Sequence, residues 1–225
     1  MRFLYPLLVC CLIPSCAPKV TPDQAIATAY RYTQVEWTPD VRNVRHGVDS
    51  QGILVQTPDQ SLKSPGGWWK PGVAAKSMPY QWGGFDTPEM FLEKIAAGKK
   101  AGDIADAAKR KLGDAGTSRE SCGIDCSGFV SRCWNLPRPY STAELPQICT
   151  PLESWGRLRP GDIVLNDKHV VLFVKWKISG EEFDAYEAGP LPVWRVSACG
   201  LRVGKLIQHG YAPWRYRGME TAAGP

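Results

Sequence analysis

One cysteine of this chain has the surroundings that a thiolate nucleophile needs. Cys126 directly follows Asp125, a residue type that often caps the N-terminus of a helix. The apolar residues after it recur at the spacing of one buried helix face: Phe129, Val130, Cys133 and Trp134. The pattern places the thiol in the first helical turn, where unpaired backbone N–H groups stabilise a thiolate and can donate to an oxyanion. Because buried cysteines are common, a purely structural Cys126 is an equal alternative on this segment alone.

A histidine and a glutamate further along the chain can complete such a site. His169 opens one predicted strand, and Glu187 lies near the end of the next. If Lys177–Glu181 form the connecting loop, the residue numbers of two facing positions in the hairpin add up to roughly 358. This register brings Glu187 within reach of His169 on the same face of the sheet. A carboxylate there would orient the imidazole and favour its protonated form. A histidine beside an apolar strand is more often structural, but the capped cysteine, the histidine and the facing acid together favour catalysis.

The spacing of apolar residues changes from a helical period to a strand period after the helix that carries Cys126. Capping residues and apolar spacing predict helices at Pro22–Tyr32, Thr87–Gly98 and Asp103–Leu112, before the cysteine helix. Strands are expected after it at Asp162–Leu165, His169–Trp176 and Glu182–Ala188, with short closing strands at Lys205–Gln208 and Pro213–Tyr216. This order predicts an α+β fold in which the nucleophile helix packs on a C-terminal antiparallel sheet.

The region before this domain is irregular. Residues 33–79 are rich in glycine, proline, aspartate and serine, with one strand expected near Ile53–Gln56. We therefore expect an N-terminal extension at residues 17–77 that wraps a domain at residues 78–225. Trp68 and Trp69 stand between glycines and can line a groove, but packing beneath loops is the favoured interpretation.

The first sixteen residues have the pattern of an export signal. Arg2 precedes an apolar run from Phe3 to Ile13, which is too short to span a bilayer but is typical of a secretory signal. The segment up to Cys16 resembles the lipobox of bacterial lipoproteins, which implies a lipidated Cys16 and a cell-envelope lipoprotein. The alternative is an ordinary cut after Cys16 or Ala17, giving a periplasmic or secreted protein. Pro6 and Pro14 disfavour a helix that folds with the domain.

Composition limits the remaining classes of function. The chain has 225 residues, a net charge of +5, 44% hydrophobic and 22% charged residues, as in an ordinary globular protein. The basic residues are scattered, so no nucleic-acid partner is expected. No cysteine pair has Cys-x-x-Cys spacing and the histidines are far apart, so no metal or other cofactor is expected either. His46 and His209 are interpreted as bystanders.

Five cysteines lie beyond the export signal: Cys122, Cys126, Cys133, Cys149 and Cys199. In an oxidising compartment, four of them can form two disulfides and leave one free thiol, for which Cys126 is the candidate. Three connectivities of the other four stay open.

Four blocks of the chain, in this order, resemble the NlpC-type cell-wall peptidases, which have a compact papain-like fold. The blocks are Pro79-Tyr80-Gln81-Trp82-Gly83-Gly84, Asp125-Cys126-Ser127-Gly128-Phe129, Pro160-Gly161-Asp162-Ile163 and His169-Val170. The match covers roughly residues 78–188.

The resemblance implies roles for individual residues. Cys126 would be the nucleophile, His169 the base and Glu187 the third polar residue, while the Tyr80 hydroxyl would help to bind the oxyanion or substrate. Trp82, Asp125 and Ser127 would contribute to substrate binding. Family members cut amide bonds in the peptide stems of peptidoglycan, often between γ-D-glutamate and a diamino acid. Two alternatives stay open: a wall-binding protein without the reaction, and an acyltransferase that uses an amine or lipid acceptor.

Two features depart from the family pattern. The family usually has histidine, asparagine or glutamine where Glu187 stands. About forty residues also separate Gly84 from Asp125, where about a dozen are common, and the extra length predicts a helical hairpin at about residues 86–118. Such an insertion is expected to roof the cleft and narrow the range of substrates.

Overall fold

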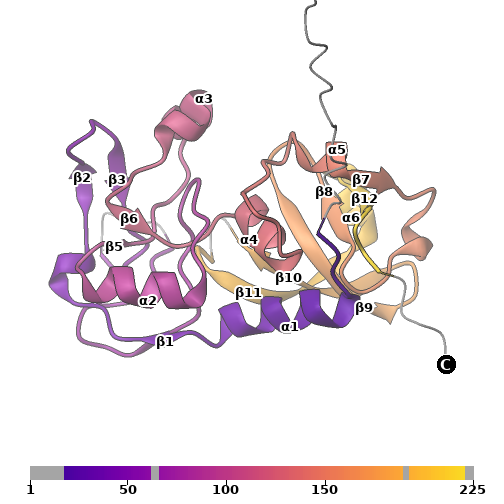
Figure 1. The fold of residues 1–225 in the computed structure, drawn as a ribbon, viewed down its shortest axis with the longest axis horizontal. Coiled ribbons are helices and arrows are strands. Elements are labelled where there is room, and N and C mark those ends of the chain that lie inside the picture. The colour runs from indigo at the N-terminus through magenta and orange to yellow at the C-terminus, as the bar shows by residue number, and fades with distance from the viewer. Residues whose placement is uncertain (1–17, 62–65, 190–192, 221–225) are drawn as a thin grey trace, which may run out of the picture.

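The computed structural model describes residues 18–61, 66–189 and 193–220 (Figure 1). The predictions for residues 1–16, including lipidation of Cys16, lie outside the described residues. Within the described part, none of the helices combines the length and the apolar character that a membrane span requires.

The described residues form both helices and strands, and the strands of the main sheet follow α5 (Leu145–Ile148). The α-helices are α1 (Pro22–Thr33), α2 (Pro88–Ala96), α3 (Ala107–Leu112), α4 (Cys126–Cys133), α5 (Leu145–Ile148) and α6 (Val203–Gln208). The 3-10 turns are η1 (Val41–Asn43), η2 (Gly113–Gly116) and η3 (Trp155–Arg157). The strands are β1 (Glu36–Trp37), β2 (His46–Val48), β3 (Leu54–Gln56), β4 (Ala75–Lys76), β5 (Lys100–Ala101), β6 (Ser121–Cys122), β7 (Cys149–Pro151), β8 (Ile163–Leu165), β9 (Val170–Ile178), β10 (Glu182–Ala188), β11 (Val196–Arg202) and β12 (Ala212–Tyr216).

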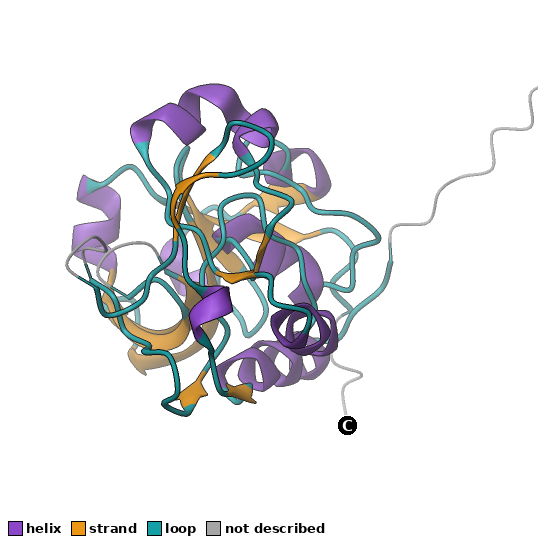
Figure 2. Ribbon diagram, turned by 90° about the vertical axis from the view of Figure 1, so that its left-hand side faces the viewer, coloured by secondary structure: helices purple, strands orange, loops and turns teal. Residues whose placement is uncertain are grey.

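A six-stranded antiparallel sheet, in the order β11-β10-β9-β8-β12-β7, forms the centre of the C-terminal half (Figure 1). The start of β9 is continuously apolar because both of its faces are covered. Val170 and Leu172 join the core that contains the residues of α4, whereas Val171 and Phe173 join a second cluster with residues of α6. The protein is therefore α+β, as the sequence predicts, with helices on both faces of the sheet (Figure 2).

Apart from Lys205–Gln208, the strands that the sequence predicts are present, and the main sheet contains two that are not predicted, β7 and β11, one at each edge. The residues of β11 include Ser197, Ala198 and Gly200, which weaken the apolar signal of a strand. The predicted closing strand at Lys205–Gln208 is wrong, because these residues belong to α6. Val203 and Leu206 are both buried and stand three residues apart, the spacing that places them on one helix face.

The N-terminal extension shares its core with the sheet half. The ring of Tyr32 in α1 meets Phe129 of α4 edge-on, with ring centroids 5.6 Å apart. Trp37 contacts Trp68 and Trp69 in the same edge-on manner. Trp69 is 2% exposed, and the Trp68 indole N–H donates to the Trp194 carbonyl at 2.9 Å. Both tryptophans therefore pack beneath loops, which is the favoured interpretation of the sequence.

The insertion differs from a simple helical hairpin. Between α2 and α3 the chain forms β5, which pairs in parallel with β6. The predicted start of α3 at Asp103 is wrong, since α3 begins at Ala107. The backbone N–H of Asp103 donates to the Tyr80 carbonyl and its carbonyl accepts from Trp82, so Asp103 pairs with an extended segment instead. Figure 1 shows α3 projecting from the rest of the molecule.

Candidate active site

Cys126 is the first residue of α4, and Asp125 is the N-cap. The Asp125 Oδ1 atom accepts hydrogen bonds from the Gly128 backbone N–H at 2.6 Å and from the Ser127 hydroxyl at 3.0 Å. Burial raises the pKa of Asp125 to about 6, although these hydrogen bonds act in the opposite direction. Asp125 and Ser127 therefore bond each other at the start of the helix. The backbone N–H of Cys126 belongs to the first turn, whose N–H groups have no intrahelical acceptor.

The thiol of Cys126 lies against the imidazole of His169, and the residue as a whole is only 7% exposed. On its other side, His169 Nε2 is 2.6 Å from Glu187 Oε2. Since Nε2 is engaged by the carboxylate, Nδ1 is the ring nitrogen left for the hydrogen bond with Cys126. Burial alone lowers the pKa of His169, but the negative charges of Cys126 and then Glu187, with their hydrogen bonds, raise it to about 10. The arrangement favours the charged imidazolium form of His169 between Cys126 and the Glu187 carboxylate.

The sheet register explains how His169 and Glu187 meet. β9 and β10 pair with Tyr186 opposite Leu172 and Ala185 opposite Phe173, so these facing positions sum to 358. At this sum, residues 169 and 187 have the same parity and lie diagonally on one face. The strand pair has two register shifts, but both lie nearer the turn that joins β9 and β10 and so do not alter the pairing next to residues 169 and 187. The predicted proximity of His169 and Glu187 is thus present in the fold.

Tyr80 is a buried neighbour of Cys126. Burial, followed by the negative charges of Cys126 and Asp125, raises the pKa of its phenol well above the usual value. The Tyr80 backbone N–H donates to the Trp194 carbonyl at 2.9 Å, and the two rings meet at a centroid distance of 5.4 Å. The hydroxyl therefore stays protonated and can donate to an oxygen that develops negative charge.

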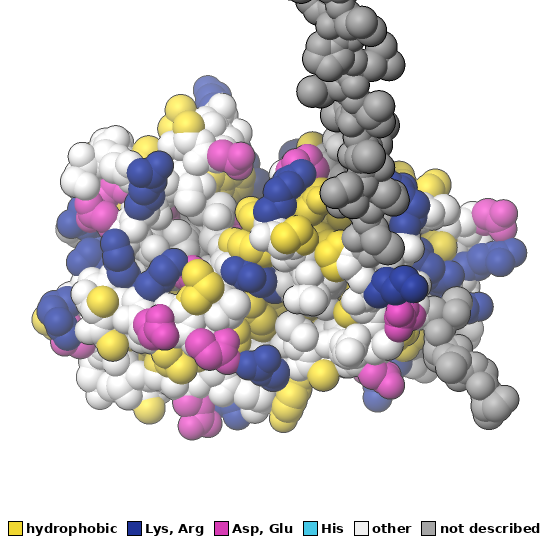
Figure 3. Space-filling model, viewed as in Figure 1, with side chains coloured by type: hydrophobic (Ala, Val, Ile, Leu, Met, Phe, Trp, Pro, Cys, Tyr) yellow, Lys and Arg dark blue, Asp and Glu magenta, His cyan; other side chains and the backbone are white. Residues whose placement is uncertain are grey.

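Trp82 connects this region to the insertion. Its indole N–H donates to the Gly113 carbonyl at 3.1 Å, and the guanidinium of Arg110 lies 5.5 Å from the centre of its ring. Trp82 is half-buried, so part of its ring stays open to solvent. These contacts place α3 and η2 on the same side of the molecule as Tyr80. Figure 3 shows that the surface is hollowed between the part that carries α3 and the part that carries α5, with hydrophobic side chains along the hollow.

Sequence reasoning missed two residues of this site. Burial raises the pKa of Tyr211, which follows α6, to about 12, and the negative charges of Glu187 and Cys126 add to this effect. Cys199 of β11 has its thiol beside the Glu187 carboxylate. Tyr211 has no local motif that could reveal it. Cys199 becomes a candidate only once β11 is recognised as the neighbour of β10.

The five described cysteines, at positions 122, 126, 133, 149 and 199, are all free thiols. The expectation of two disulfides is therefore wrong. Cys122, Cys133 and Cys149 are buried in separate parts of the core, on β6, α4 and β7, and burial raises the pKa of each thiol. They act as small apolar residues.

The other two histidines have partners of their own. His46 Nε2 is 2.8 Å from Asp59 Oδ1 and 3.0 Å from the hydroxyl of Ser61, within the N-terminal extension. His209 Nδ1 donates to the Lys205 carbonyl at 2.8 Å at the end of α6. Among the described residues, no group of three or more histidine, cysteine, aspartate or glutamate side chains could hold a metal ion.

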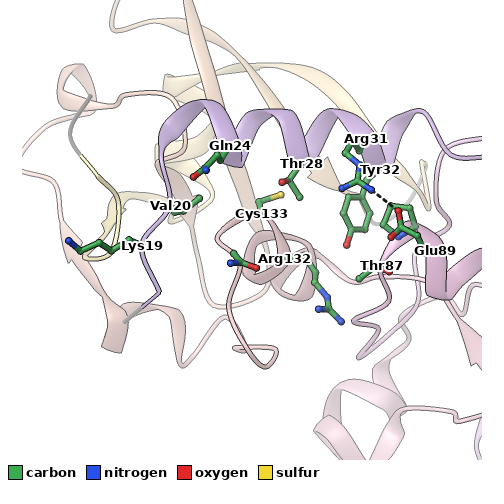
Figure 4. A pocket seen from close by; sticks show the side chains of 12 residues that line it. Lys19, Val20, Gln24, Thr28, Arg31, Tyr32, Thr87, Glu89, Arg132 and Cys133 are labelled. Carbon is green, nitrogen blue, oxygen red and sulfur yellow. Dashed lines mark hydrogen bonds and ion pairs between the residues drawn. The ribbon is translucent and has the colours of Figure 1, made fainter. Parts of the chain in front are cut away.

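A separate pocket of about 370 Å³ lies at the opposite end of α4 (Figure 4). Residues of α1, α2 and α4 line it, and the Arg31–Glu89 ion pair, at 2.6 Å, lies along its edge. Cys133 and Tyr32 reach it from the core. None of the side chains of the candidate active site takes part in it.

Comparison of the chain with family models, curated proteins and solved structures finds no match. The function is therefore argued from the geometry of the site.

Proposed function

We propose that this protein is an exported cysteine amidohydrolase of the NlpC type, with a papain-like fold, that cleaves amide bonds in peptidoglycan stem peptides. One observation carries the proposal: the thiol of Cys126, at the N-terminus of α4, contacts His169, which is bonded to Glu187 at 2.6 Å. A nucleophile, a base and an orienting acid in contact are what covalent acyl transfer requires.

In the first half of the reaction, the Cys126 thiolate attacks the amide carbonyl carbon and forms a carbon–sulfur bond. The carbonyl oxygen becomes an oxyanion, to which the Cys126 backbone N–H and the Tyr80 hydroxyl can donate. His169 then gives its proton to the leaving nitrogen as the carbon–nitrogen bond breaks. The products of this half are a free amine and a thioester on Cys126.

In the second half, water attacks the thioester carbonyl while His169 accepts one of its protons. The carbon–sulfur bond breaks, the acid product leaves, and the thiolate–imidazolium pair is restored. Glu187 keeps its carboxylate on Nε2 throughout, so that the other ring nitrogen always faces the sulfur.

The substrate class rests on the NlpC resemblance and on the expected export. The hollow beside α3 offers an open path for an extended peptide, and Arg110 of the insertion lies 5.5 Å from the centre of the Trp82 ring. Lipidation at Cys16 would hold the enzyme at a membrane that borders the cell wall.

Incubation with defined stem peptides, followed by mass spectrometry of the fragments, tests the proposal. The expected result is a cut at one amide bond, with a gain of 18 Da shared between the two products because one water is consumed. Cys126→Ala should reduce turnover by at least about 10³-fold. Cys149→Ala is the matched control, since it removes a buried thiol from β7 and should retain activity.

The same assay separates the alternatives. An acyltransferase would give an amide or ester of an added acceptor in place of the free acid. A wall-binding protein would retain wall fragments equally with and without the Cys126→Ala change, and would release no amine. Equal hydrolysis by the wild type and Cys126→Ala would refute the proposed nucleophile.

A further inference from the structure

β11 lies beside β10, the strand that carries Glu187. β11 pairs with β10 so that Ser197 faces Glu187 and Cys199 faces Ala185. Cys199 is therefore the diagonal neighbour of Glu187 on the same face of the sheet. Its thiol lies beside the Glu187 carboxylate and also 3.8 Å from the Ala185 carbonyl oxygen.

A second donor would hold the Glu187 carboxylate more firmly than His169 alone. Its side chain is 16% exposed, and Oε2 is engaged by His169. The other oxygen, Oε1, lies against the backbone of Gly189, where a Cβ atom would stand 3.3 Å from it. A half-buried carboxylate with a single donor can rotate away from that donor, whereas a second donor fixes its plane.

Cys199 is suited to be that donor because its thiol keeps its proton. Burial, and then the negative charge of Glu187, raise the pKa of Cys199 above the usual value for a thiol. Between the two acceptors within reach, the charged carboxylate is stronger than the Ala185 carbonyl. Cys199 is also a free thiol, so no disulfide competes for its sulfur.

We propose that Cys199 is a positioning residue for the candidate active site: its thiol donates to Glu187 and so fixes the carboxylate that orients His169. The site is then a chain of four side chains, Cys126, His169, Glu187 and Cys199, built on α4, β9, β10 and β11. The catalytic meaning of this chain rests on the proposed function. The hydrogen bond itself does not.

The test compares Cys199→Ala, which removes the donor, with Cys199→Ser, which keeps one. The first readout is the downfield proton resonance of the His169 imidazole N–H, recorded by NMR on the ¹⁵N-labelled full chain and assigned by its loss in His169→Gln. We expect Cys199→Ala to move this resonance and Cys199→Ser to return it toward the wild-type position. His46, bonded to Asp59 at 2.8 Å, supplies an internal reference that should not move.

The second readout is the rate at which iodoacetamide alkylates Cys126 at neutral pH, measured by mass spectrometry. Loss of a hydrogen bond to a charged group predicts a decrease of about tenfold in Cys199→Ala, with most of the rate restored in Cys199→Ser. Cys149→Ala controls for the loss of a buried thiol elsewhere and should change neither readout.

The proposal is overturned if Cys199→Ala leaves the resonance and the alkylation rate unchanged, or if Cys199→Ser behaves like Cys199→Ala. Neither readout needs a substrate. A wild-type protein that hydrolyses no stem peptide would therefore refute the proposed function, while these two measurements would still decide the role of Cys199.

Discussion

His169 lies between two groups that both favour its charged form. A neutral partner at position 187 would orient the imidazole, whereas the carboxylate of Glu187, with the thiolate of Cys126, raises the pKa of His169 to about 10. In the proposed reaction, this raised pKa would strengthen the thiolate–imidazolium pair. It would also make the imidazolium a weaker acid toward the leaving amine and the neutral imidazole scarce during deacylation.

The pKa of His169 predicts a pH dependence of stability. The folded value of about 10 lies above the ordinary value of 6.5, so the protonated His169 stabilises the fold fully below about pH 6.5. This contribution should fall as the pH rises and disappear above about pH 10. Urea unfolding of the wild type and of His169→Gln, from pH 6 to pH 10.5, measures it as the difference in unfolding free energy.

The alkaline limit of the proposed amide hydrolysis should also lie near pH 10, since loss of the His169 proton leaves no acid for the leaving amine.

The unfolding experiment can contradict this account. If the difference in unfolding free energy between wild type and His169→Gln stays constant over this pH range, the imidazole carries no charge in the folded protein.

The predicted and the missed residues of the site differ in how local their signals are. Cys126 is revealed by a cap and an apolar stripe within ten residues, and His169 and Glu187 by counting across one hairpin. Cys199 comes close to Glu187 through the pairing of β11 with β10, and Tyr211, after α6, is near enough for the charge of Glu187 to raise its pKa. Such contacts are set by tertiary packing, which no short sequence window records.

At the scale of elements, the position of α4 depends on a close approach between two backbones. An added Cβ at Gly128 would stand 2.3 Å from the Gly84 carbonyl oxygen, and Gly84 itself accepts a hydrogen bond from the Asp125 N–H. Only a glycine at position 128 therefore lets the first turn of α4 sit against the segment that carries Tyr80 and Trp82. The sequence predicts the helix but not this contact.

Gly128→Ala is expected to destabilise the protein by about 1–3 kcal/mol, because the new methyl group pushes α4 away from Gly84. Gly204→Ala in α6 is the matched control, since nothing lies within 4 Å of its added Cβ and alanine favours a helix by about 0.5–1 kcal/mol. Thermal unfolding of both variants measures the contrast. Alkylation of Cys126 should slow only in Gly128→Ala, and equal Tm values would contradict the argument.

At the scale of the whole molecule, a buried ion pair joins the extension, the insertion and the candidate site. The Lys109 ammonium of α3 contacts the Asp103 carboxylate, and the two side chains are 2% and 0% exposed. Asp103 also accepts from the backbone of Gln56 in β3 at 3.0 Å, and its own backbone pairs with Tyr80 and Trp82. Burial raises the pKa of Asp103 to about 6 despite the ammonium beside it.

Lys109→Met should destabilise the protein by about 3–5 kcal/mol, because it leaves the Asp103 carboxylate buried without its cation. Arg31→Met is the comparison: it breaks the Arg31–Glu89 pair, in which both side chains are 62% exposed, and should cost no more than about 1 kcal/mol. Urea unfolding at pH 7 gives both values. Equal losses of unfolding free energy in the two variants would mean that the buried ion pair contributes no more to stability than the exposed one.

The first and last described segments lie side by side and are hydrogen-bonded to each other. The Val20 N–H donates to the Gly218 carbonyl at 3.1 Å, the Glu220 N–H donates to the Val20 carbonyl at 2.9 Å, and the Tyr216 hydroxyl reaches the Pro18 carbonyl at 2.8 Å. Because these two segments are adjacent, the chain could be joined here and opened at another surface turn without changing how the helices and strands pack. A short linker from Glu220 to Pro18 would allow new ends in the turn between β2 and β3, giving a circular permutant in which α4, β9 and β10 keep their connections.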